Sequence, residues 1–450
     1  MTRTSNFTEG PILSPLLWFT LPVLLALFLQ TMYGAVDLMV VGQFGQPADV
    51  SAVSTGSQVM MSVTALIAGL SMGATILLGQ KLGEGKTEEG GGVAGSAVAL
   101  FAAVAAALTA VMILAAAPLS RLMQAPTEAF DQTETYVRIC SGGATFIVAY
   151  NALGAMFRGI GDSKTPLLTV FIAGVVNIAG DLLLVGAAGM GVTGAALATI
   201  LAQAVSVALS LLFTARRGLP FHFTPRDIRF DPHYTGHILS LGAPVALQDV
   251  LVSVSFLAIA AIVNGIGVIA SAGVGVAEKL CGFIMLVPSA YMQSLSAFVA
   301  QNVGAGRQDR ARKSLFYGIG TSLCCGVVLG WLAFFHGNLL AGLFARDAQV
   351  IAASTDYLRA YAIDTLLTSI LFCFAGYFNG RGNTAFVMVQ GIVGAFLVRI
   401  PVSLLMSRQE PVSLFKVGLA TPCSSLVQIL IFLCGFVLIS ARERRGFRAG

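Results

Sequence analysis

Gln80-Lys81-Leu82-Gly83-Glu84-Gly85-Lys86 returns 221 residues later as Gln301-Asn302-Val303-Gly304-Ala305-Gly306-Arg307. Phe157-Arg158-Gly159-Ile160-Gly161-Asp162 returns as Phe378-Asn379-Gly380-Arg381-Gly382-Asn383, and Pro22 returns as Pro244 at an offset of 222. Three matches in the same order and at nearly one spacing indicate two related halves. Duplicated helical halves are typical of secondary transporters, which place a substrate site where the halves meet.

The composition indicates a membrane protein. Only 10% of the residues are charged, 56% are hydrophobic, and the mean hydropathy is +0.85. A soluble chain of 450 residues needs more charge to cover its surface. The pI near 8.9 therefore does not require nucleic acid as a partner. None of the seven cysteines forms a C-x-x-C pair, so we interpret them as small core residues rather than disulfides or metal ligands.

The fold class that we predict is an all-α membrane protein with twelve transmembrane helices in two pseudo-symmetric six-helix lobes. A spanning helix needs about 20 largely apolar residues. The segments that meet this condition are 12–41, 52–79, 91–120, 137–157, 166–187, 192–214, 238–264, 277–302, 314–336, 355–379, 384–407 and 414–441. The proline-rich and charged stretch 215–237 separates an N-lobe, residues 1–214, from a C-lobe, residues 238–450. It is the predicted cytoplasmic linker.

The distribution of Lys and Arg predicts the orientation. If the N-terminus is cytoplasmic, 18 basic residues lie in cytoplasmic segments and 6 lie on the other side, while Lys279 and Arg399 fall in spans. This bias predicts a multi-pass protein of the cell (inner) membrane with both termini in the cytoplasm. The apolar stretch near the N-terminus continues as a spanning helix, so we expect no cleavable signal peptide.

Two aspartates lie deep inside predicted spans of the N-lobe. Asp37 shares one helical face with Tyr33 and Gln30, and Asp181 lies one turn after Asn177. An aspartate at the bilayer centre costs about 2.5–3.5 kcal/mol, so it needs a partner or a function. Two such carboxylates can bind a small cation or share a proton. The alternative is that both are packing residues hydrogen-bonded to the backbone.

The other charged residues within spans allow more than one interpretation. Glu278 adjoins Lys279 near the predicted start of span 277–302, which suggests an ion pair at a helix end. Asp249 and Asp364 could form a second polar site in the C-lobe, or they could reach toward the membrane interface. Arg399 could balance a C-lobe acid or contact an anionic group.

The order and spacing of these motifs resemble the multidrug and toxic compound extrusion (MATE) family. The resemblance covers residues 14 to 441 and rests on Val36-Asp37 with Val41-Gly42, the two Gln-x-x-Gly-x-Gly turns, and Phe157 to Asp162. It implies an antiporter that expels amphipathic, often cationic drugs in exchange for H⁺ or Na⁺ as two lobes rock. It also implies that a helix-1 proline, Pro22 here, bends during the switch.

In one branch of that family the N-lobe holds the cation. The resemblance places that cation site on Tyr33, Asp37, Asn177, Asp181 and Thr199, and if the ion is Na⁺, its ligands are Asp37, Asn177, Asp181 and Thr199. Another branch uses a Glu and an Asp of the C-lobe. The matching positions here hold Val252 and Thr368, while Asp249 and Asp364 lie about one turn earlier, so C-lobe coupling is open.

These features favour cation-coupled drug export over other functions. The candidate substrate-lining residues, chosen because Met and aromatic side chains adapt to varied apolar shapes, are Gln30, Tyr33, Met60, Met61, Gln248, Asp249, Phe256, Met285, Tyr291, Met292 and Asp364. The alternative is a flippase of lipid-linked precursors with a related fold, whose anionic substrate calls for more than one deep Arg. We expect no enzyme activity, no cofactor beyond the coupling ion and no nucleic acid, and we expect a monomer in the lipid bilayer.

Overall fold

The computed structural model describes residues 7–449 and the side chains through Ala441. Arg3 and the side chains of the C-terminal arginines used in the orientation prediction lie outside the described residues. Helices make up the fold, and no strand occurs in the described part of the chain. Eleven helices are long and apolar enough to cross a membrane, and a bent helix pair brings the number to twelve. The predicted all-α fold with twelve spans is confirmed.

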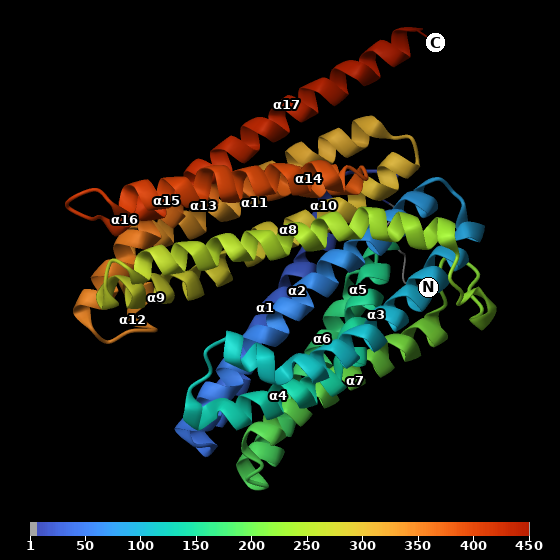
Figure 1. The fold of residues 1–450 in the computed structure, drawn as a ribbon. Coiled ribbons are helices and arrows are strands. Elements are labelled where there is room, and N and C mark those ends of the chain that lie inside the picture. Colours follow the sequence, from blue (N-terminus) through green and yellow to red (C-terminus); the bar gives the residue numbers. More distant parts are fainter. Residues whose placement is uncertain (1–6, 450) are drawn as a thin grey trace. The chain divides into compact units, whose positions relative to one another are not determined.

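The first half contains six spans in chain order (Figure 1). They are α1 (Leu13–Phe44), α2 (Pro47–Gly83), α3 (Thr87–Leu122), the pair α4 (Phe130–Gly142) and α5 (Ala144–Gly159), α6 (Lys164–Asp181) with the π-helical η2 (Leu182–Ala187), and α7 (Gly191–Arg217). The α4–α5 span includes the short helix η1 (Thr127–Ala129) and is bent by 52°. Each of these spans buries its backbone N–H and C=O groups within itself, as hydrocarbon requires.

The second half repeats this order. Its spans are α8 (Pro232–Asn264), α9 (Val268–Ile284) with α10 (Leu286–Gly304), α11 (Gln308–Phe335), α13 (Ala348–Gly380), α14 (Thr384–Ile392) with the π-helical η4 (Val393–Arg399) and α15 (Ile400–Ser407), and α16 (Leu414–Gly418) with α17 (Ala420–Ala449). The short α12 (Gly337–Gly342) precedes α13. A π-helical segment therefore interrupts the fifth span of each half.

The duplicated motifs end their helices in one common way. The last glycine of each motif has a positive φ, between 72° and 85°, at Gly85, Gly161, Gly306 and Gly382. In each turn the N–H of the next residue donates to a carbonyl five residues earlier, as in Asp162 to Phe157 at 2.8 Å. This is the hydrogen bond of a glycine-terminated helix, and a side chain at the left-handed position would strain it. The repeat therefore encodes four equivalent helix ends.

The first glycine of the Gln-x-x-Gly-x-Gly motif has a different role. A Cβ on Gly83 would collide with the carbonyl oxygen of Gln301, and a Cβ on Gly304 would collide with that of Gln80. The two copies of the motif thus pack backbone against backbone. Gln301 also donates its side-chain amide to the Gly159 carbonyl at 2.8 Å. Gln301 of the second glutamine motif therefore contacts both first-half motifs, the glutamine motif at Gly83 and the phenylalanine motif at Gly159.

The chain divides into two compact units. The first unit comprises Met1–Ala246 with Ala300–Gln308, and the second comprises Leu247–Val299 with Asp309–Gly450. In the first unit the segment after α7 lies along α3, because Gly91 and Gly95 leave room for the backbone of His222 and Asp227. The helix η3 (Pro225–Asp227) is capped by Thr224, whose N–H donates to Asp227 and holds the pKa of that carboxyl below its usual value.

Four spans of the second half begin earlier than the sequence predicted, at residues 232, 268, 308 and 348. Because α9 begins at Val268, Glu278 lies ten residues inside the helix, and the interpretation of Glu278 as an end-of-helix partner of Lys279 is wrong. The small residues of 270–275 lower the local hydropathy, yet they continue the helix. Asp249 and Asp364 likewise lie near the middles of α8 and α13. Their distance from the helix ends removes the alternative in which they reach the interface.

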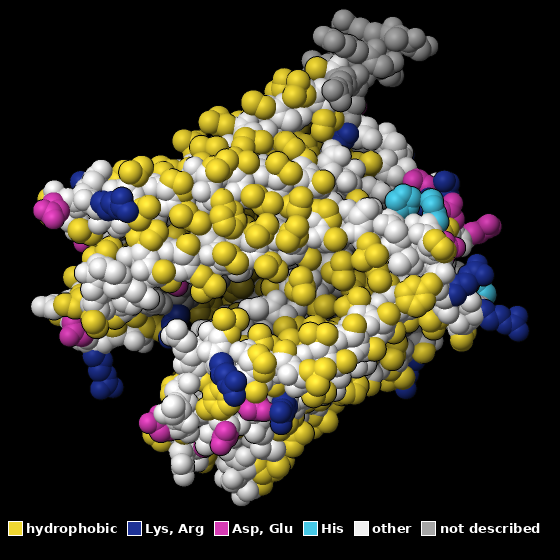
Figure 2. All heavy atoms as spheres, in the orientation of Figure 1, with side chains coloured by type: hydrophobic (Ala, Val, Ile, Leu, Met, Phe, Trp, Pro, Cys, Tyr) yellow, Lys and Arg dark blue, Asp and Glu magenta, His cyan; other side chains and the backbone are white. Residues whose placement is uncertain are grey.

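The kind of side chain on the surface changes along the helices, from apolar on their sides to charged near their ends. On the face shown in Figure 2, hydrophobic side chains cover most of the helix surfaces, while Lys, Arg, Asp and Glu gather mainly near helix ends. Large apolar residues such as Leu114, Leu257 and Leu397 are exposed on the described surface. An apolar surface of this extent is stable when it faces lipid.

Candidate functional site

The polar face of α1 points into the first unit. Asp37 is 5% exposed, and Tyr33 and Gln30 are half-buried on the same face. Gln30 donates its side-chain amide to the Tyr150 hydroxyl of α5. Tyr33 lies against α6, where a Cβ on Gly174 would be 3.5 Å from its ring. The stripe predicted from the sequence is therefore an interior face that contacts two neighbouring helices.

The opposing helix α6 carries Asn177 and Asp181 one turn apart, and both are almost completely buried. Gly180 lies between them and allows α7 to approach, because a Cβ there would be 2.9 Å from Ala198. The π-helical segment η2 starts directly after Asp181. Such segments widen a helix locally and are common at functional sites. The local backbone thus brings the end of α6 close to α7.

The structure brings the two predicted carboxylates together. The helix α1 packs against α6, and the carboxyl groups of Asp37 and Asp181 are close enough to interact directly. One oxygen of Asp37 and both oxygens of Asp181 are buried without a hydrogen-bond donor among the described residues. Two buried carboxylates without donors repel each other in a medium of low dielectric constant. A shared proton or a bound cation would remove that repulsion.

Neutral oxygen and amide groups surround the pair. Both polar side-chain atoms of Asn177 are buried without a partner in the described structure, as is the side-chain oxygen of Gln203. Thr199 and Gln203 lie one turn apart on α7, and Tyr33 interacts with Gln203. The hydroxyl, carboxylate and amide oxygens in this set are the ligands that hard cations prefer. Five predicted residues, Tyr33, Asp37, Asn177, Asp181 and Thr199, therefore lie in one region of the first unit.

Three further residues belong to this region and were missed in the sequence. Tyr136 of α4 is 3% exposed, interacts with Asp37 and Thr199, and lies 3.1 Å from the hydroxyl of Ser57 on α2. Gln203 is the third. The predicted span began at residue 137, which placed Tyr136 in a loop. The signal was available, because Tyr136 and Cys140 lie one turn apart on the apolar face of a polar helix.

The candidate substrate residues of the first unit differ in burial. Met60 is 8% exposed and belongs to a hydrophobic cluster with Val59 and Val63, whereas Met61 is 70% exposed. Adjacent positions on one helix point in different directions, so these two methionines face different surroundings. Gln30 and Tyr33 remain beside the carboxylate pair.

The candidates of the second unit lie on α8, α10 and α13, with Met285 between α9 and α10. Gln248 of α8 packs against Gly391 of α14, and Phe256 lies under the guanidinium of Arg399 with 4.5 Å between its ring centroid and Cζ. Tyr291 is 5% exposed, and it interacts with Thr321 of α11. Asp249, Met285 and Met292 are half-buried on α8 and around the start of α10. Asp364 is 1% exposed and accepts a hydrogen bond from Ser425 at 2.6 Å.

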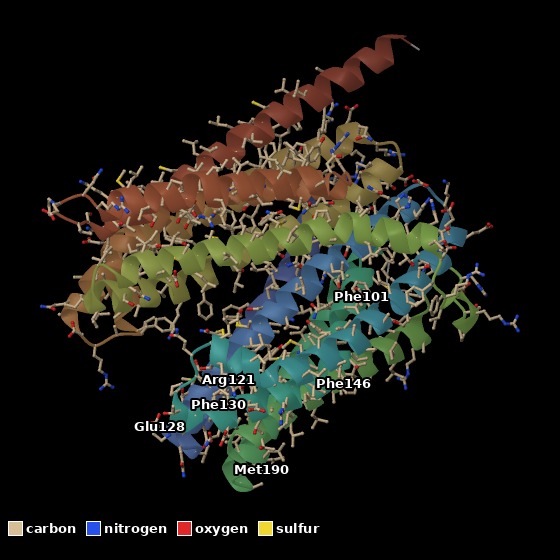
Figure 3. The ribbon with its side chains drawn as sticks, in the orientation of Figure 1. Phe101, Arg121, Glu128, Phe130, Phe146 and Met190 are labelled. Atoms are coloured by element: carbon tan, nitrogen blue, oxygen red, sulfur yellow. The ribbon has the colours of Figure 1, made fainter. Side chains whose placement is uncertain are left out.

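The turn between α3 and α4 lies near one end of the helices of the first unit. Figure 3 shows Arg121, Glu128, Phe130 and Met190 toward the same end of the helices, with Phe101 farther along. The guanidinium of Arg121 lies 5.9 Å from the ring centroid of Phe130. This contact joins the end of α3 to the start of α4.

The residues of this region can hold a small cation through oxygen atoms or share a proton. It offers two carboxylates, while no group of three or more His, Cys, Asp and Glu suited to a metal occurs among the described residues. The predicted ligands for Na⁺, Asp37, Asn177, Asp181 and Thr199, supply oxygen atoms from three helices. A ligand that joined α1, α6 and α7 would change how these helices pack.

Comparison with known families gives two matches. The model described as MatE matches residues 22–183 and 244–405. The second match begins and ends 222 residues after the first, at 22 to 244 and 183 to 405. The family model therefore detects the same repeat as the motifs, with the same offset.

Curated relatives extend over nearly the whole chain. The "Probable multidrug resistance protein YpnP" of Bacillus subtilis is 26% identical over 405 residues, covering 90% of this chain and 91% of that protein. A "FAD transporter" of Shewanella oneidensis is 26% identical over 434 residues and covers 95% of each. A solved outward-facing multidrug resistance MATE family transporter matches with a TM-score of 0.91 and 21% identity, over 99% of both chains.

Proposed function

Because this chain belongs to the MatE family, we propose that it is a cation-coupled antiporter that exports amphipathic, often cationic compounds by alternating access. The observation that carries the proposal is the buried Asp37–Asp181 pair, in which one oxygen of Asp37 and both oxygens of Asp181 have no donor among the described residues. Relatives with multidrug resistance and multidrug export in their names support the class of cargo. The proposed location is the inner membrane with both termini in the cytoplasm.

In the proposed coupling, one site alternates between a state without a cation and a state that holds H⁺ or Na⁺. H⁺ or Na⁺ binds between Asp37 and Asp181 from outside, with Asn177 and Thr199 as further ligands for Na⁺. Binding removes the repulsion between the carboxylates and allows α1 and α6 to pack more closely. The cation and the exported compound favour different conformations, and this difference couples their transport.

Pro22 is the proposed bending point of α1. It lies inside a continuous helix, and its ring nitrogen cannot donate the usual hydrogen bond to the preceding turn. A helix bends at low cost where this bond is missing. The variant Pro22→Ala should bind the cation but export more slowly, because the cation would no longer drive a bend.

The proposal is tested with purified protein in proteoliposomes. Export of ethidium, an amphipathic cation, is followed under an imposed Na⁺ gradient and, separately, under an imposed pH gradient. One of the two gradients should drive ethidium movement against its own gradient, and dissipating it should stop transport. Ethidium that moves only down its own gradient under both conditions would contradict coupled antiport.

A second class of cargo is favoured by one relative. The Shewanella oneidensis protein is named as a FAD transporter and is as similar to this chain as YpnP. An anionic cargo, whether a flavin nucleotide or a lipid-linked precursor, needs cationic groups at the substrate site. Arg399 is a buried arginine of the described second unit. FAD that competes with ethidium in the same assay would support this class of cargo.

A further inference from the structure

The second unit contains a polar cluster that the proposed function does not use. It lies among α8, α9, α13, η4 and α17 and includes Asp364, Glu278, Arg399, Tyr357 and Tyr361. Tyr357 interacts electrostatically with Glu278, Asp364 and Arg399, and Cys281 interacts with both acids. These side chains therefore form one cluster with two acids and one permanent cation.

Arg399 is built into this cluster. Its side chain is 6% exposed, its guanidinium donates to the hydroxyl of Ser255 at 3.1 Å, and it lies over the ring of Phe256. The π-helical segment η4 ends at Arg399, two residues before Pro401. A buried guanidinium needs a compensating charge, and Asp364 interacts with it electrostatically.

Arg399 and Asp364 do not form a direct ion pair in the described structure. Asp364 instead accepts the hydroxyl of Ser425, and the Nε atom of Arg399 is buried without a partner. Glu278 also has a buried oxygen without a donor. Arg399 therefore acts on the acids of the cluster through space rather than through one contact pair, and its single charge can compensate only one of the two.

The repeat places this arginine at a defined position. At the offset of 222 shown by the two MatE matches, Arg399 corresponds to Asn177, and Ser255 corresponds to Tyr33. The contact between Arg399 and Ser255 thus repeats the packing of α1 against α6. Thr421 corresponds to Thr199, whereas Ile259 and Ser403 stand where the first half has Asp37 and Asp181. The second half keeps the threonine, lacks the aspartate pair and carries a guanidinium.

We propose that Arg399 is a tethered cation that fills the C-terminal counterpart of the ion site and prevents Asp364 from taking up a transported cation. The inference rests on the proposed N-terminal coupling site and adds to it the reason why the second half carries no ion. Arg399 is a specificity-determining residue in this account. A Na⁺ or proton that approaches Asp364 meets a fixed positive charge that already compensates it.

The inference predicts that removing the guanidinium creates a cation site. The starting protein is the double variant Asp37→Asn/Asp181→Asn, which should bind neither radiolabelled Na⁺ nor extra protons after a pH jump. Adding Arg399→Gln should restore binding of one cation per chain. Adding Asp364→Asn as well should abolish it again, and Arg399→Lys should restore nothing, since it keeps the charge.

Two results would overturn the inference. One is a folded, monodisperse Arg399→Gln variant that gains no cation in the double-variant background. The other is cation binding by the double variant itself that Asp364→Asn removes, because the second half would then bind an ion despite Arg399. Cation binding by the double variant that survives Asp364→Asn would contradict the proposed N-terminal site instead. It would still agree with a C-terminal cluster that binds no cation.

A second variant tests the inference if Arg399→Gln does not fold. Asp364→Asn in the otherwise unchanged protein keeps the guanidinium and should leave the number of bound cations unchanged. The same variant should lower thermal stability, since Arg399 loses its compensating charge. A fall in the number of bound cations would contradict the inference, because it would make Asp364 an ion ligand.

Discussion

The two halves of the chain share their helix ends and differ in their buried charges. Gly85 and Gly306, or Gly161 and Gly382, adopt the same conformation in equivalent turns. The first half buries Asp37 and Asp181 beside neutral ligands, whereas the second half buries Arg399 with Asp364 and Glu278 nearby. The difference teaches that the scaffold can be duplicated while a pair of buried carboxylates is not, because Ile259 and Ser403 stand at the positions equivalent to Asp37 and Asp181.

The largest expected effect follows from neutralising the first half. Asp37→Asn and Asp181→Asn should each lower drug resistance of expressing cells by about tenfold or more, since each removes a charge that the cation needs. Resistance is measured as the minimal inhibitory concentration of ethidium at matched expression. The exposed Asp131→Asn on α4 is the control and should resemble the unchanged protein.

The scaffold should respond alike in both halves. Gly83→Ala and Gly304→Ala each place a methyl group against a backbone carbonyl, which should destabilise the fold by about 1–3 kcal/mol, the usual cost of overpacking. Thermal unfolding of the purified protein measures the effect. Gly320→Ala on α11 meets no atom within 4 Å and should not destabilise the protein. A large loss of stability for only one of the two variants would show that the contact between the two copies of the motif is not symmetric.

Smaller effects are expected from the neutral ligands. Asn177→Ala and Thr199→Val should each weaken cation binding by about twofold to tenfold, the equivalent of about 0.5–1.5 kcal/mol for one lost polar contact. The counterpart Thr421→Val in the second half should leave cation affinity unchanged. Titration with the coupling ion measures these affinities, and equal losses for Thr199 and Thr421 would remove the difference between the halves.

An ion pair at the surface of α4 should matter least. Arg138, which is exposed, and Glu134, which is half-buried, approach to 2.7 Å. Glu134→Gln should change the free energy of unfolding by less than about 1 kcal/mol, because water and salt screen such pairs. Thermal unfolding at low and high salt measures it. A loss as large as that of the glycine variants would contradict the view that only buried charges distinguish the halves.

The sequence predicted the architecture well because its signals are local. The length of the apolar segments, the glycine turns and the offset of Pro22 and Pro244 can all be identified in the sequence without knowledge of packing. The pair Asp37 and Asp181 could also be predicted, since an acid inside a span is costly wherever it packs. The resemblance to the family, rather than spacing, supplied Thr199.

Other parts of the site depend on tertiary packing. Tyr136 was placed outside a span because the polar start of α4 obscured the helix. Glu278 was assigned to a helix end because the small residues before it hid ten residues of α9. The contact of Arg399 with Ser255 joins residues 144 apart in sequence, and no local pattern indicates which hydroxyl a buried guanidinium reaches.

The most direct test of the central claim compares one acid from each half in the same assay. Ethidium export from proteoliposomes is driven by the gradient that drives the unchanged protein, with Asp37→Asn and Asp364→Asn measured in parallel. The account predicts that Asp37→Asn abolishes gradient-driven export, while export by Asp364→Asn still depends on the gradient, whatever the change in its affinity for ethidium. Gradient-driven export that persists in Asp37→Asn and disappears in Asp364→Asn would place the coupling site in the second half and contradict the account.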